Sequence, residues 1–115
     1  MKKLFDELEA KGVKFSREAS VGITRTPSGK ITWLETGNSK AGLQHIMERH
    51  SKEFSSWGLN NQDEVANLIL ETVTTKNGVQ QGGATIYDVV VGGKPRKLKV
   101  VISENGFIVT AHPFS

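Results

Sequence analysis

The sequence of 115 residues contains no cysteine, and this absence removes several kinds of chemistry at once. There can be no disulfide framework and no zinc site held by thiolates. Three histidines are present, and two of them lie five residues apart in one short segment. Histidines without cysteine point to acid–base chemistry rather than to thiol or metal chemistry.

Long apolar runs and nucleotide-binding signatures are also missing. No hydrophobic stretch approaches the length of a membrane span, and Asp6, Glu7 and Glu9 interrupt the start that a signal peptide would need. The chain has no Walker loop, dinucleotide fingerprint, GxSxG elbow or HExxH pattern. Aromatic residues make up only 7% of the chain, which argues against a general binder of single-stranded nucleic acid.

The length predicts one domain with a single core. The formal net charge is +3, and part of the positive charge is concentrated in residues 94–99. The four basic residues of this segment are Lys94, Arg96, Lys97 and Lys99. Such a basic strand is typical of contact with a phosphate backbone. It also fits a solvated strand face that discourages pairing between sheet edges.

The first two thirds of the chain read mainly as helices. We expect helices over residues 2–11, 40–54 and about 62–75, because apolar residues recur there with a period near 3.6. Ser39 is the expected N-cap of the second helix, and the polar run at residues 60–64 predicts a capped start for the third. Two short strands, at residues 21–25 and 30–35, flank a turn that contains Pro27. Beyond residue 77 the period changes to two, which predicts a meander with strands at 85–91, 96–103 and 107–112, closed by Pro113. The expected fold class is α+β, with helices packed on a C-terminal antiparallel sheet.

The two central histidines occupy different positions on the expected helix. His50 lies on the apolar stripe that includes Ile46 and Phe54, whereas His45 projects about half a turn away, near Arg49. On this pattern alone His50 also fits a satisfied core residue, and His45 fits a solvated surface residue. The spacing of five does not place both rings on one face, so we expect no metal site and no cofactor.

Strand alternation groups a second set of side chains. If the apolar residues of the last two strands face the helices, Lys97, Lys99, Thr110 and His112 share the opposite face. A histidine, a hydroxyl and lysines on one surface suit RNA cleavage without a metal. The 2′-hydroxyl of the RNA is the nucleophile, so the protein needs only a base, an acid and a cation for the phosphorane. A strand threonine and a terminal histidine are also common without any such role.

Three segments resemble a known family. They are GKITWLETGN at residues 29–38, GLQHI at 42–46 followed by Arg49 and His50, and NGFIVTAHP at 105–113. Together they are similar to the barnase–EndoU–colicin–RelE-like (BECR) nucleases found as C-terminal toxin domains of contact-dependent inhibition (CdiA-type) and other polymorphic toxins, and in phage. The resemblance covers residues 29 to 113, so we expect a nuclease core at 29–115 and an accessory segment at about 1–28.

The resemblance implies a BECR-like fold, metal-independent ribonuclease activity, often on tRNA, and a dedicated immunity protein as partner. It also implies delivery as part of a larger secreted or cell-surface toxin that acts in the cytoplasm of the target cell. By position, His45 or His50 corresponds to the catalytic histidine of the family's helix, and Thr110 to its strand hydroxyl. His112 stands where relatives often have an aromatic residue, so it is either an acid–base group or a stacking platform.

These expectations define two sets of site residues. The residues expected to act in catalysis are His45, His50, Lys97, Thr110 and His112. Those expected to bind the RNA are Arg49, Lys94, Arg96 and Lys99. Two other functions fit the same sequence: a non-catalytic RNA-binding module, and a protein-interaction domain. The basic pI, about 9.3, argues against an immunity protein, because partners of basic nucleases are usually acidic.

Overall fold

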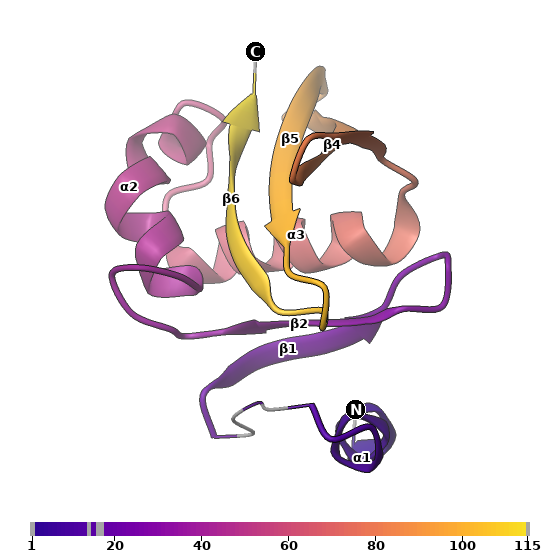
Figure 1. Ribbon diagram of the computed structural model, residues 1–115. Helices are drawn as coiled ribbons and strands as arrows, with labels where there is room; N and C mark the ends of the chain where they lie inside the picture. The colour runs from indigo at the N-terminus through magenta and orange to yellow at the C-terminus, as the bar shows by residue number, and fades with distance from the viewer. Residues whose placement is uncertain (1, 14, 16–17, 115) are drawn as a thin grey trace.

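A computed structural model describes residues 2–13, 15 and 18–114 of the chain. The described part is an α+β fold with three helices, a two-stranded sheet and a four-stranded antiparallel sheet, as expected from the change in hydrophobic period (Figure 1). The elements follow in the order α1 (Lys2–Ala10), β1 (Ser20–Arg25), β2 (Ile31–Glu35), α2 (Leu43–Ser55), α3 (Gln62–Thr75), β3 (Val79–Gln81), β4 (Ala84–Val91), β5 (Lys94–Ile102) and β6 (Ile108–Phe114).

The β1–β2 hairpin forms a layer of its own between α1 and the rest of the molecule (Figure 1). Side chains alternate across the hairpin. Trp33 belongs to a small apolar cluster with Leu8 of α1, whereas its neighbour Leu34 belongs to the main core. On the other face α3 approaches β1 so closely that a Cβ at Gly22 would meet Leu70 at 2.5 Å. The hairpin therefore joins two cores, and the expected boundary at residue 28 falls inside it.

The start of α2 differs from the expected one. The helix begins at Leu43 with Gly42 as its N-cap residue, and Ser39 does not cap it. The loop before it is closed by the side chain of Asn38, whose oxygen accepts hydrogen bonds from the backbone of Lys40 and Ala41. Gly42 adopts φ 91°, a conformation that disfavours any other residue, so the helix cannot continue back toward residue 40.

The start of α3 agrees with the expected capping sequence. The side chain of Asn61 accepts a hydrogen bond from the backbone N–H of Glu64 at 2.9 Å. In return, the carboxylate of Glu64 accepts from the backbone N–H of Asn60 at 3.1 Å. The two bonds satisfy the N–H of Glu64, which the first helical turn would otherwise leave unpaired, and fix the residue that precedes the N-cap.

The four-stranded sheet has the order β3-β4-β5-β6, so β6 is an edge strand. Pro113 does not end β6, contrary to the expectation, because the strand continues to Phe114 and Pro113 pairs with Leu98. An edge strand tolerates proline where the missing N–H would face away from the neighbouring strand. The main core lies between this sheet, α2, α3 and β2, and includes Ile46, Phe54 and Val100.

None of the helices in the described part of the chain is both long enough and apolar enough to cross a membrane.

Tyr87 of β4 provides a test of this core at alkaline pH. Its side chain is buried, and burial raises the pKa of the hydroxyl above the ordinary value of 10.0. Above about pH 10 the unfolded chain loses this proton while the native state keeps it, so the unfolded state binds fewer protons. The contribution to stability is complete below that pH and is lost as pH rises toward the raised pKa.

We expect the free energy of unfolding, measured with urea between pH 9 and 11, to fall less steeply in Tyr87→Phe. Equal slopes in both proteins would contradict the assignment.

Candidate functional site

A backbone hydrogen bond sets helix α2 beside the edge strand β6. The N–H of Gly42 donates to the carbonyl of Val109 at 2.9 Å, which ties the helix start to the strand start. Counted from Gly42, His50 lies eight residues along the helix, or about 12 Å. Counted from Val109, His112 lies three residues along the strand, or about 10 Å. The two histidines therefore reach a similar height at the seam between α2 and β6, two elements that lie side by side (Figure 1).

The rings of His50 and His112 are stacked. Their centroids are 4.7 Å apart, and their planes differ by 24°. His50 lies between Ile46 and Phe54 on the apolar stripe, as expected, yet 21% of its side chain is exposed. The reason is that this part of the stripe faces the edge of the sheet, where the core ends. The structure thus brings together a helix histidine and a strand histidine 62 positions apart in the sequence.

Hydrogen bonds fix the proton positions on this pair. Nδ1 of His50 lies 2.8 Å from Oε1 of Glu53, and Nδ1 of His112 lies 2.8 Å from the carbonyl oxygen of Pro113. A carboxylate and a carbonyl can only accept, so each Nδ1 carries a proton. In the neutral rings both Nε2 atoms are then left with a lone pair, which is the form that a general base requires.

His45 belongs to the same group, contrary to the expectation that it projects elsewhere. Its ring lies edge-on to that of His50, with centroids 6.3 Å apart. Nδ1 of His45 donates to the carbonyl oxygen of Ser39 at 3.0 Å, so the loop before α2 orients this ring. The five-residue spacing separates the two Cα positions by about 140° around the helix axis, but the side chains are long enough to approach across it.

Lys99 is a basic residue that lies across the β5–β6 pairing from one of the two stacked histidines. It is the cross-strand partner of His112 in the β5–β6 register. Residues opposite one another in a sheet project from the same face. The Nζ of Lys99 lies over the ring of Phe114, 5.3 Å from its centroid, which holds the ammonium group near the end of β6.

The other expected cations are more scattered. Lys97 pairs with Asp88 of β4, with Nζ 2.5 Å from the carboxylate oxygen, so its charge is directed away from β6. Lys94 is exposed at the far end of β5, about 16 Å along the strand from Lys99. Arg49 is exposed on α2 next to His50 in sequence. Arg96 stacks over Trp57 at the end of α2, with its guanidinium carbon 5.3 Å from the ring centroid.

Thr110 lies on the same strand face as His112, two residues earlier. Its hydroxyl oxygen is buried and has no hydrogen-bond partner among the described residues. A buried hydroxyl without a partner costs free energy. Because this oxygen is buried, a substrate cannot reach it in this conformation.

Three of these residues form a donor set that suits a metal ion. One ligand atom from each of His50, Glu53 and His112 lies within 4.8 Å of the others. Two imidazoles and a carboxylate are ligands that Zn²⁺ accepts. The same three groups also suit proton transfer without an ion, so a chelator distinguishes the two uses.

Two residues of this site were missed by the sequence analysis, Glu53 and Trp57. Glu53 follows His50 by three residues, a helical spacing at which side chains meet, so the His50–Glu53 contact was readable from the sequence. Trp57 lies beyond the helix end, where periodicity gives no direction, and only the structure shows its contact with Arg96.

Neither the family models nor the curated proteins with which the chain was compared gave a match.

Proposed function

We propose that this chain is a metal-independent endoribonuclease that cleaves RNA by attack of the 2′-hydroxyl. The observation that carries the proposal is the stacked pair of His50 and His112, each with its Nδ1 proton held by an acceptor. Such a pair supplies the two proton transfers that the reaction needs, one at each end of the phosphate.

In the proposed reaction, Nε2 of one histidine removes the proton of the 2′-hydroxyl, and the 2′-oxygen attacks the adjacent phosphorus. The bond from phosphorus to the 5′-oxygen breaks, and the other histidine, in its protonated form, donates a proton to that oxygen. The products are a 2′,3′-cyclic phosphate and a 5′-hydroxyl. The reaction needs one ring as the base and the other as the acid, so the two histidines enter it in different protonation states.

The surrounding residues have supporting roles in this proposal. Glu53 orients the ring of His50 and balances the charge that the ring carries as imidazolium, as a carboxylate does in other histidine-based sites. Lys99 lies where its ammonium group can neutralise the charge of the phosphorane. His45 offers a third imidazole beside the phosphate.

The biological role rests on the family resemblance. The segments at 29–38, 42–50 and 105–113 are similar to those of BECR nucleases, and the seam between α2 and β6 is formed by two of them. We therefore infer a toxin domain of the contact-dependent or polymorphic type, with tRNA as substrate and an immunity protein as partner. An acidic immunity protein would complement the basic strand β5 and cover the histidines.

The direct test is to incubate the purified protein with bacterial tRNA in the presence of EDTA. Discrete fragments with 2′,3′-cyclic phosphate ends are expected. Cleavage that EDTA abolishes and Zn²⁺ restores would replace this proposal with metal-dependent hydrolysis at His50, Glu53 and His112. Salt-dependent tRNA binding without cleavage, unchanged when the three histidines are replaced, would instead support a non-catalytic RNA-binding module.

The two neighbouring lysines of β5 provide a matched pair of variants. Lys99 faces His112, whereas Lys97 is paired with Asp88. We expect Lys99→Ala to lower kcat/KM for tRNA by roughly 10²-fold, in the range seen when one charge-stabilising donor is removed. Lys97→Ala should lower it less, because the charge of Lys97 is paired with Asp88, although Lys97 also lines the groove beside the histidines. Loss of activity in Lys97→Ala alone would place the phosphate at Lys97 rather than at Lys99.

A further inference from the structure

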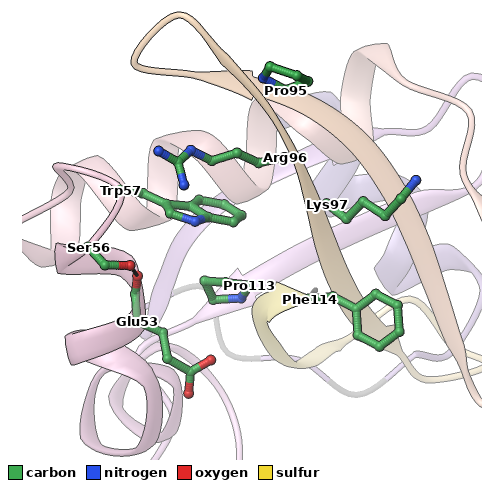
Figure 2. Close-up of a pocket in the computed structure, with 8 residues that line it drawn as sticks. All are labelled: Glu53, Ser56, Trp57, Pro95, Arg96, Lys97, Pro113 and Phe114. Carbon is green, nitrogen blue, oxygen red and sulfur yellow. Dashed lines mark hydrogen bonds between the residues drawn. The ribbon is translucent and has the colours of Figure 1, made fainter.

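We propose that the groove beside the paired histidines is a nucleobase subsite that selects a purine next to the cleaved bond. This inference rests on the proposed function and names the part of the RNA that the site recognises. The groove lies between the end of α2 and the strands β5 and β6 and has a volume of about 540 Å³ (Figure 2). Small-molecule sites are commonly about 300–1,000 Å³, so a nucleotide fits.

The groove is continuous with the histidine pair through two shared residues. Glu53 lines the groove and also accepts the Nδ1 proton of His50. Pro113 lines it as well, and its carbonyl oxygen accepts the Nδ1 proton of His112. A ligand in the groove therefore lies directly beside the proposed reaction centre. In an RNA chain bound at that centre, the base of an adjacent nucleotide is the group that comes to lie there.

Two aromatic rings from different elements line the groove, Trp57 after α2 and Phe114 at the end of β6. Figure 2 shows Trp57 above Pro113 and Phe114 to its right, with the guanidinium of Arg96 over Trp57. Each ring has a cation over one face, because Lys99 lies over Phe114. Aromatic rings accompanied by positive charge are the combination on which nucleobases stack while their phosphates are held.

Arg96 is the residue that we expect to give the subsite its preference for purines. Its Nε donates to the carbonyl oxygen of Val91 at 3.3 Å, and this is the single hydrogen bond that the guanidinium makes among the described residues. The terminal nitrogens of the planar guanidinium are left to bind a ligand. Both purines present the acceptor N7, which pyrimidines lack, and their larger rings overlap more of an aromatic wall. We therefore expect a purine to bind more tightly than a pyrimidine.

The activity test uses oligouridine substrates that contain a single adenine or guanine, compared with oligouridine alone. The wild-type protein should cut next to the purine with a kcat/KM at least tenfold higher than at uridine. Phe114→Ala and Arg96→Lys should each remove most of this preference through a higher KM, whereas Phe114→Tyr, which keeps the ring, should retain it. Equal cleavage of all sites by the wild-type protein would overturn the subsite and leave the ribonuclease activity intact.

A binding measurement separates the two proposals if no RNA is cleaved. Trp57 is partly exposed in the groove, and the other tryptophan, Trp33, is buried. Adenosine and guanosine monophosphates should quench the fluorescence of the protein at lower concentration than uridine and cytidine monophosphates, and Trp57→Phe should lose this response. Purine-selective quenching without RNA cleavage would support the subsite and refute the nuclease. Quenching that does not distinguish the bases, or that persists in Trp57→Phe, would refute the subsite.

Discussion

Replacing His50 or His112 by alanine is expected to lower the rate of tRNA cleavage by about 10²- to 10⁴-fold, the usual contribution of a general acid or base. The two rings act at opposite ends of the same phosphate, so the double variant should lose little more than the more damaging single variant. His45→Ala, which removes a ring 6.3 Å from His50 but leaves the stacked pair, should have a smaller effect. Single-turnover rates measured in EDTA check this order.

A modified substrate assigns the acid and the base. In RNA with sulfur in place of the 5′-oxygen at the cleaved bond, the leaving group departs without a proton. Such a substrate should restore the rate of the variant that lacks the acid and should not restore that of the variant that lacks the base. Restoration of neither variant, or of both, would contradict a division of roles between His50 and His112. Full activity in both variants on ordinary RNA would refute the mechanism.

Replacing Trp33 by alanine is expected to lower the free energy of unfolding by about 3–5 kcal/mol, the usual loss for a large buried aromatic residue. Trp33 is 1% exposed, and its indole N–H donates to Glu35 at 2.8 Å. Its ring packs edge-on against Phe15 and Phe107, which lie on opposite sides of it in the sequence. Urea unfolding of the full chain measures the loss, and Trp33→Phe provides a milder variant that should remain folded.

Trp57 is the matched control for this change. It is only partly buried at the end of α2, so Trp57→Ala should cost less than half as much stability. A similar loss in both variants would mean that the cluster around Trp33 contributes little. The same comparison tests the role of the N-terminal segment. If Trp33 is as important as its burial indicates, residues before 29 are part of the folding unit and not an accessory, because Leu8 and Ile23 complete its cluster.

Part of the candidate site could be predicted from the sequence, because the direction of those side chains depends on local geometry. A helix or strand fixes the direction of each side chain relative to its near neighbours. The pattern of β5 therefore placed Leu98 in the core and Lys99 on the other face, and the structure agrees. The pattern of α2 placed His50 between Ile46 and Phe54, again as found. The capping of α3 by Asn61 could also be predicted from the local sequence, because the residue to which Asn61 is hydrogen bonded lies within four positions of it.

The errors occurred where a residue's surroundings depend on distant parts of the chain. The start of α2 was placed too early because the loop before it is tied to Val109, far along the sequence. Pro113 was taken as a strand end, but the edge position of β6 allows the strand to continue. Lys97 was expected in catalysis and Lys99 in RNA binding. The contact of Lys97 with Asp88 and the pairing of Lys99 with His112 are the reasons for which we exchange these roles.

The sequence by itself therefore determined the α+β class, most of the element positions and part of the set of residues from which the proposed site is built. Hydrophobic period and capping are set within a few residues, so they can be read without knowing the fold. The tertiary structure alone decided which members of that set meet. The stacking of His50 on His112 depends on the hydrogen bond between Gly42, at the start of α2, and Val109, at the start of β6. These two residues are far apart in the sequence, so no local pattern predicts the contact.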